Sequence, residues 1–291
     1  MKHVVESARK LIRQLLQALI LALSFVLLAD AFWVRSRSFL IEAETTVLSV
    51  VLETEVLWPV KSSTLCLPGS GRRRAEDALC GRNQPRSVDR IFTFQAGDTL
   101  EIRVEREKGL VVQSNSKAAA LEGGFLIMPL EAWTQSGLLT LRGVFTLGKP
   151  PSTGGAPELL RSGRYEAREN TMLMRGFAER SIVTTQGTLM RGAVVRAEKT
   201  DGGHVVASAV ISAGGEIEDP LLHAVLVTEA GKSALMIDFL GAEPVRISPG
   251  FMDRILQNPI LLMLAFLLPI GLGGGQLLMG TRKMMGGERS R

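Results

Sequence analysis

Hydrophobic residues follow two different patterns along this chain. Near each end they form an unbroken block, at residues 15–34 and 255–280, whereas from Ile41 onward they alternate with polar residues. An apolar block of about 20 residues is typical of a membrane-spanning helix, and alternation with a period of two is typical of a strand with one buried face. The pattern therefore predicts a β-rich middle between two transmembrane helices.

The first block, residues 15–34, contains one ionisable residue, Asp30, close to its outer end. At about 1.5 Å rise per residue the block can cross a hydrocarbon core about 30 Å thick. Basic side chains in residues 1–14 predict that this tail is cytoplasmic. Ala29-Asp30-Ala31 also fits a signal-peptide cleavage site, so the block is either a retained helix or a cleaved signal, and the middle is exported in both cases. Asp30 is either a hydrated acid at the interface or an intramembrane acid with a function.

The second block is uncharged, and the tail that follows it, residues 281–291, is basic. A second basic flank predicts that both termini face the cytoplasm and that the middle of the chain lies outside. Gly271 and Gly275 form a G-x-x-x-G pattern, which lets two helices approach closely. The alternative is a Gly-rich anchor without a specific partner.

The middle of the chain reads as a series of short strands. In Thr99 to Arg106, the apolar residues Leu100, Ile102 and Val104 alternate with charged ones, so they are expected to face a core. Turn signals such as Asp201-Gly202-Gly203 separate many of the runs. The other runs are Thr46 to Trp58, Arg90 to Phe94, Leu138 to Leu147, Arg180 to Thr185, Leu189 to Ala197, His204 to Ser212, His223 to Thr228 and Ala234 to Phe239. This spacing predicts an all-β, antiparallel, sandwich-like or barrel domain.

Residues 148–157 interrupt this series, because they contain too many Pro and Gly residues to join regular structure. If they are a linker, they divide one β lobe at residues 35–147 from a second at residues 158–254. If they are a loop, a single large domain contains both halves.

The net charge of +5 is located at the two ends of the chain. The ends hold 8 of the 34 Lys and Arg residues and 3 of the 29 Asp and Glu residues, leaving 26 of each sign between Arg35 and Arg254. A nucleic-acid-binding domain is expected to carry a basic face. The neutral middle therefore argues against a nucleic-acid partner.

Two cysteines, Cys66 and Cys80, lie in the predicted exported domain. In an oxidising compartment such a pair most often forms a disulfide, although free thiols remain an alternative. A zinc site would need two further ligands, and the surrounding sequence contains no His. Arg72, Arg73 and Arg74 follow Cys66 in the same polar loop and form either a docking site for anionic headgroups or an acidic partner, or a solvated charge cluster.

Few residues suggest catalysis. His204 and His223 are the only histidines outside the N-terminal tail, and both lie in strand-like runs, where a core or rim position is expected. Ser114 and Lys117 fit S-x-x-K without its companion motifs, and no P-loop, G-x-S-x-G, H-E-x-x-H or EF-hand motif is present. Trp58 and Trp133 could stack on sugars if exposed, but core packing is their default role. We therefore expect no cofactor and no metal.

These features favour a non-catalytic protein of the cell envelope. The absence of an N-x-[ST] sequon mildly favours a bacterial inner membrane over a eukaryotic secretory compartment. We expect a scaffold or adaptor subunit whose exported, periplasmic β domain binds other envelope proteins in a homo- or hetero-oligomer. The alternatives are a membrane-anchored glycan- or lipid-binding domain and an envelope hydrolase.

Overall fold

The computed structural model describes residues 36–68, 80, 83–114, 121, 123–150, 159–170, 182–216, 218–239 and 243–250. It also describes isolated helical positions near the two ends, at residues 15, 18, 19, 22, 25, 252, 253, 256 and 262. The chain divides into two compact units, one made of residues 36–168 and 185–248, and the other of residues 1–35, 169–184 and 249–291. The first unit holds most of the β structure.

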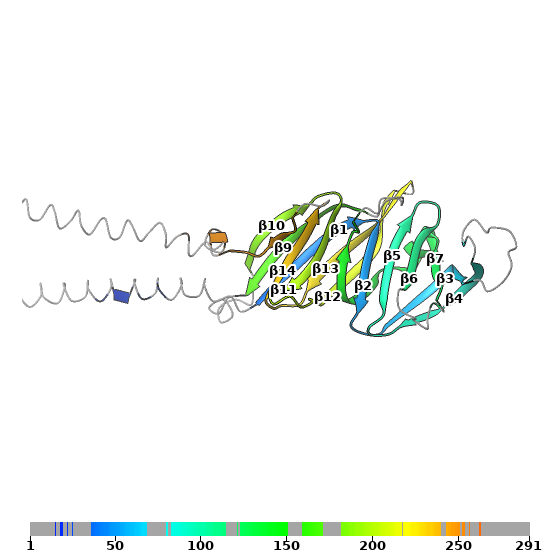
Figure 1. Ribbon diagram of the computed structural model, residues 1–291, viewed down its shortest axis with the longest axis horizontal. Helices are drawn as coiled ribbons and strands as arrows, with labels where there is room; N and C mark the ends of the chain where they lie inside the picture. The colour runs from blue at the N-terminus through cyan, green and yellow to red at the C-terminus, as the bar shows by residue number, and fades with distance from the viewer. Residues whose placement is uncertain are drawn as a thin grey trace, which may run out of the picture. The chain divides into compact units, whose positions relative to one another are not determined.

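The described residues form a mostly antiparallel sheet of 15 strands and one short helix (Figure 1). The all-β prediction is confirmed at this level. The elements are β1 (Ser36–Thr45), β2 (Val47–Leu52), β3 (Val56–Leu67), β4 (Gln84–Phe94), β5 (Thr99–Glu105), β6 (Gly109–Ser114), β7 (Phe125–Met128), α2 (Leu130–Ser136), β8 (Leu139–Leu147), β9 (Leu160–Asn170), β10 (Ile182–Leu189), β11 (Ala193–Lys199), β12 (Ala207–Glu216), β13 (Asp219–Thr228), β14 (Ser233–Phe239) and β15 (Val245–Ile247).

The strands follow one path with a branch at β8. The path runs β10-β9-β1-β13-β12-β8-β2-β5-β6-β7-β3-β4, and β11, β14 and β15 lie off it. One edge of β8 pairs with β2, while the other pairs with β12 along Leu139–Gly143 and with β11 at Thr146 and Leu147. Since β8 precedes residues 148–157 and both β11 and β12 follow them, strands from the two halves of the chain belong to one sheet.

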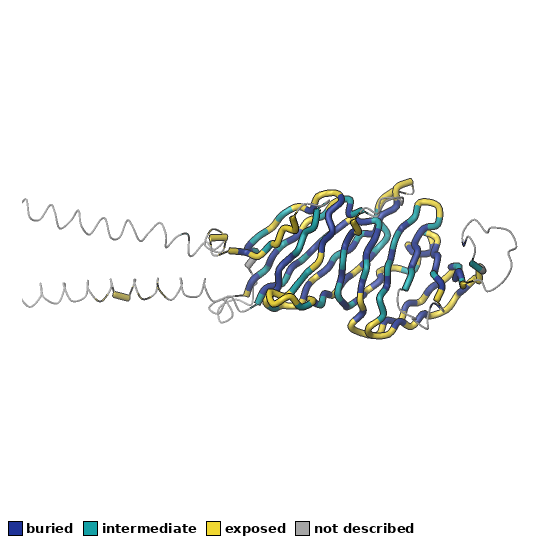
Figure 2. Tube along the Cα trace, viewed as in Figure 1, coloured by how far each residue is buried: buried dark blue, intermediate teal, exposed yellow. Residues whose placement is uncertain are grey.

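Alternation decides which side chains enter the core. In β5, Leu100, Ile102 and Val104 are buried, while the charged residues between them are only partly buried, as the sequence predicts. Figure 2 shows the same alternation of buried and less buried positions along many of the strands. The prediction of one run from Thr46 to Trp58 is wrong in detail, because Glu53, Thr54 and Glu55 separate β2 from β3. The polar residues break the strand where the chain turns toward β3.

The buried side chains form one large hydrophobic cluster drawn from both halves of the chain. Trp133 of α2 is 1% exposed and Trp58 of β3 is 5% exposed, so both indoles lie in the core. Full burial of a Leu or Phe side chain stabilises a fold by about 1.5–3 kcal/mol, and many such residues contribute here. The sheet is therefore held together mainly by apolar packing.

Arg37, near the start of β1, clasps the beginning of the sheet to its end. Its guanidinium Nη1 donates to the Ser233 carbonyl at 2.8 Å and to Ser248 Oγ at 3.3 Å, and its backbone exchanges two hydrogen bonds with Gly231. Arg37 is only 8% exposed, so these acceptors compensate for removing its charge from water. The clasp joins the third residue after the first hydrophobic block to the seventh residue before the second.

The two predicted membrane segments lie almost entirely outside the described residues, as do the basic tails. Within the part of the chain that the structure describes, no helix combines the length and apolar character needed to cross a membrane.

Candidate interaction surfaces

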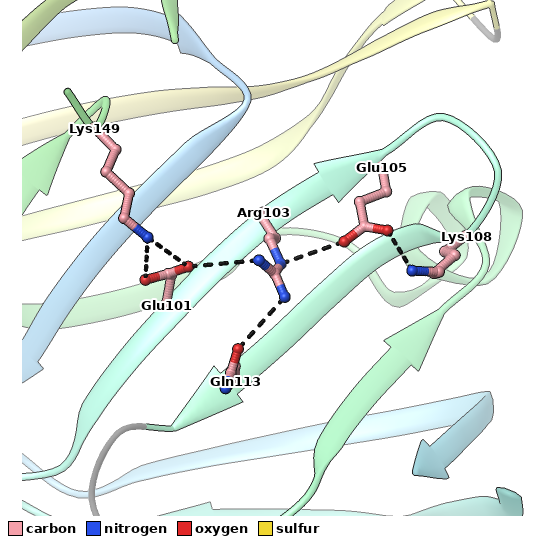
Figure 3. Close-up of polar contacts among 6 residues, drawn as sticks. All are labelled: Glu101, Arg103, Glu105, Lys108, Gln113 and Lys149. Carbon is pink, nitrogen blue, oxygen red and sulfur yellow. Dashed lines mark hydrogen bonds and ion pairs between the residues drawn. The ribbon is translucent and has the colours of Figure 1, made fainter. Parts of the chain in front are cut away.

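A row of alternating charges lies on the face of β5 that points away from the core (Figure 3). Arg103 lies between two carboxylates of its own strand: its guanidinium is 3.8 Å from Glu101 and 3.4 Å from Glu105. It also donates to Gln113 Oε1 of the neighbouring β6 at 3.4 Å. The register that places Glu101 opposite Gln113 brings these groups together.

Two lysines complete this row. Lys149 Nζ lies 3.3 Å from Glu101, and Lys108 Nζ lies 2.6 Å from Glu105. Three cations thus face two carboxylates, so most of the local field is cancelled within the row itself. The charged groups of the row are therefore paired mainly with one another.

The two cysteines form a disulfide between β3 and the loop that follows it. Cys66 and Cys80 are bonded through their sulfur atoms, with Cα atoms 5.5 Å apart, as the sequence predicts. Together with Val111 of β6 and Ile127 of β7 they make a small second hydrophobic cluster, against which Phe125 packs. These three residues alternate with the core-facing residues of β6 and β7, so the disulfide secures Cys80 on the opposite face of the sheet from the main core.

The two histidines have different strand neighbours. His204 is exposed and makes an isolated bridge to Glu198, whereas His223 lies opposite Glu44 in the β1–β13 register. Ser162 Oγ donates to the Glu44 carboxylate at 2.7 Å, rather than to an imidazole. In a Ser–His–Asp triad the serine donates to an imidazole, and the hydrogen bond of Ser162 goes to a carboxylate instead.

A two-stranded ribbon lies where β3 and β4 leave the rest of the sheet. β7 pairs with β3 only at Thr64–Cys66, so Val56–Val60 has β4 as its described strand partner. A register shift between Val60 and Ser63 separates the ribbon from the rest of β3. One face of the ribbon carries Trp58 and Phe92 into the core, while the other exposes Leu57 (64%) and Ile91 (63%).

A second apolar area lies on the outer face of β1, β12 and β13. Leu40 is opposite Val227, and Val210 is opposite Val225 in the registers of these strands. Val227 is 48% exposed and Val210 is 36% exposed. The central strands therefore present β-branched side chains to their surroundings, not only charged ones.

A small apolar gap lies between several strands of the main core. Its volume of about 10 Å³ is at the lower limit for a single water. It is lined mainly by apolar residues from β1, β8, β11, β12 and β13. The described residues also contain no group of three or more His, Cys, Asp or Glu side chains arranged to hold a metal ion.

Several predicted site residues fall outside the described part of the chain. These are Asp30, Arg72, Arg73, Arg74, Gly271 and Gly275. Conversely, sequence reasoning missed the exposed ribbon. Its signal was present, because Leu57 follows Val56 and precedes Trp58, which makes the run apolar at a position where alternation calls for a polar residue.

Comparisons with known proteins give no match to this chain, whether to a family model, a curated protein or a solved structure.

Proposed function

We propose that this chain is a non-catalytic subunit of a bacterial envelope complex, held in the inner membrane by a helix at each end. Both termini face the cytoplasm, and the sandwich-like β domain is exported and acts as a scaffold or adaptor for other envelope proteins.

The Arg37 clasp is the observation that carries this proposal. It brings Ser248 within hydrogen-bond distance of the second residue of β1. The two hydrophobic blocks thus connect to neighbouring points of the β domain, which supports insertion of both into one membrane with the domain on one side.

The isolated described positions of the terminal segments add support. Leu15, Leu19 and Phe25 are helical and 63–74% exposed, and so are Met252 and Leu256 at 65% and 61%. Apolar side chains repeatedly exposed on a helix favour an apolar surrounding such as lipid.

The features of the sheet support action through a surface. Apolar side chains are exposed on the β3–β4 ribbon and on β12 and β13. Exposed apolar patches are typical of protein-binding faces.

A labelling experiment tests the topology. Asp201→Cys lies at an exposed turn of the β domain, and Arg289→Cys lies in the C-terminal tail. We expect a membrane-impermeant maleimide applied outside the inner membrane to label Asp201→Cys, and to label Arg289→Cys only after lysis. Labelling of Arg289→Cys in intact cells would refute the proposed orientation.

Purification tests the role. After gentle detergent extraction, affinity purification and mass spectrometry should recover stoichiometric partners from the membrane fraction. Recovery of a lone monomer carrying a bound lipid or sugar would instead favour a ligand-binding domain.

A further inference from the structure

β4 ends the main path of strands, and among the described residues no strand pairs with its outer edge. An edge strand of 11 residues presents unpaired N–H and C=O groups, which form a template for a further strand. Next to this edge the ribbon exposes Ile91 of β4 and Leu57 of β3 to more than 60%. An open edge beside exposed apolar side chains is a docking site for another strand.

The pair formed by Pro59 and Ile91 indicates which backbone groups face outward. Pro59 of β3 lies opposite Ile91 of β4, and proline has no N–H to donate. A proline therefore suits a non-hydrogen-bonded pair of an antiparallel ladder. In such a pair the N–H and C=O of Ile91 point away from β3, toward the open edge.

We propose that the β4 edge pairs with the same edge of a second copy of this chain, antiparallel and centred on Ile91. The two copies are related by a two-fold axis through the Ile91–Ile91 pair, so their sheets join into one. This inference rests on the proposed function, since it supplies a docking edge for an assembly subunit.

Charge repulsion disfavours the registers centred on three residues next to Ile91. The two-fold axis is perpendicular to the sheet, so each face of β4 stays on the same side in both copies. In every possible register, one residue therefore lies at the centre, directly opposite the same residue of the second copy. A centre at Val88 places Arg86 opposite Arg90, a centre at Asp89 opposes two carboxylates, and a centre at Arg90 opposes two guanidiniums. Like charges directly opposite each other destabilise a sheet.

A centre at Ser87 is excluded for a different reason. It places Pro85, which cannot donate a hydrogen bond, opposite Asp89 of the second copy. Registers centred on a residue after Ile91 would pair fewer residues of the two β4 strands.

The centre at Ile91 brings together compatible groups. Ile91 meets Ile91, Asp89 meets Thr93, and Arg90 meets Phe92 of the second copy. Arg90 lies over the Phe92 ring of its own chain, 4.6 Å from the centroid, and this register places no like charge opposite it. On the outer face, the Leu57 and Ile91 side chains of both copies become one apolar strip.

Cysteine cross-linking in the full-length membrane protein tests the register. Directly opposite hydrogen-bonded residues have Cα atoms about 5.5 Å apart, within the disulfide range of about 4.4–6.8 Å. Ile91→Cys should therefore give a covalent dimer with a mild oxidant or a short thiol-to-thiol reagent. The native cysteines do not compete, because they are bonded to each other.

Matched variants on the same edge provide controls. Two copies of Thr93 lie about 14 Å apart in this register, and so do two copies of Asp89, so Thr93→Cys alone and Asp89→Cys alone should give no covalent dimer under the same treatment. A mixture of the two variants should cross-link, because Thr93 lies opposite Asp89. Dimers of Thr93→Cys alone that equal those of Ile91→Cys would overturn the register.

A charge at the centre tests the association without a cross-link. Ile91→Lys places two lysines opposite each other and removes the central apolar contact, so the dimer should weaken about tenfold or more. Met190→Lys is the control, because Met190 is equally exposed (68%) but lies outside β4. The measurement is the protein mass in detergent by light scattering.

The outcomes separate this inference from the function on which it rests. Chains that stay monomeric, give no Ile91→Cys dimer and still purify with stoichiometric envelope partners overturn β4 pairing and leave the scaffold function intact. Monomers without any partner overturn both.

Discussion

Loss of the disulfide should lower the free energy of unfolding of the β domain by about the entropic cost of closing the loop between Cys66 and Cys80. The bond joins residues separated by 14 positions, and closing a loop of about 15 residues removes about 3 kcal/mol of chain entropy from the unfolded state. Cys66 and Cys80 are also 0% and 4% exposed and share a cluster with Val111 and Ile127. Replacing both with alanine therefore removes packing as well as the cross-link.

Urea unfolding of the full-length protein in detergent measures the effect, with the fluorescence of Trp58 and Trp133 as reporters because both indoles are buried. With a slope of about 2 kcal/mol per molar urea, 3 kcal/mol lowers the midpoint by about 1.5 M. Wild-type protein that is unfolded, reduced and refolded in reductant should show this shift.

The Cys66→Ala/Cys80→Ala variant supplies the control for the reagent. Its midpoint should be the same with and without reductant, since no bond remains to be broken. A reduced wild type whose free energy of unfolding falls by less than about 1 kcal/mol would refute the loop-closure reasoning.

Three further predictions concern other parts of the chain. Gly109→Ala should destabilise the protein by at least about 1 kcal/mol more than Gly97→Ala in the same urea assay. Both glycines have positive φ, but only at Gly109 would an added Cβ lie 2.5 Å from a backbone oxygen. Equal losses of stability in the two variants would contradict this. Burial raises the pKa of Tyr165 above its ordinary value of 10, so the unfolded chain loses the proton first and stability should fall as the pH rises past 10. Tyr165 is the only tyrosine, so tyrosinate absorbance reports it directly, and identical titrations of native and unfolded protein would refute the shift. Gly271→Leu with Gly275→Leu should reduce recovery of membrane partners, whereas the corresponding alanine variants should reduce it less, and unchanged recovery with leucine would remove the proposed helix contact.

Alternation predicted the strands that have one buried and one solvated face, and it failed where that condition does not hold. β6 buries Leu110, Val111 and Val112 in succession, because its second face is covered by the disulfide cluster. The alternation also fails to identify β9, because its buried positions include Ala167 and Glu169 in place of large apolar residues. A periodicity of hydrophobic residues cannot identify either strand.

Strand order could not be predicted from the sequence, because it depends on contacts between residues that are distant along the chain. β1 pairs with β13, so that Leu40 lies opposite Val227, and nothing local to either strand selects the other. Only this long-range pairing brings Glu44 opposite His223. The surroundings of His223 could therefore be described only once the register was known.

The open edge shows how a local signal acquires meaning from strand order. The sequence places Ile91 between Arg90 and Phe92, an apolar residue at an outward position. If β4 were a central strand, its backbone would already be satisfied and Ile91 would be one more exposed side chain, which is common on protein surfaces. Because β4 ends the path, the same residue combines an exposed side chain with backbone groups directed at the open edge. The proposed interaction site thus depends on position in the sheet and not on residue type alone.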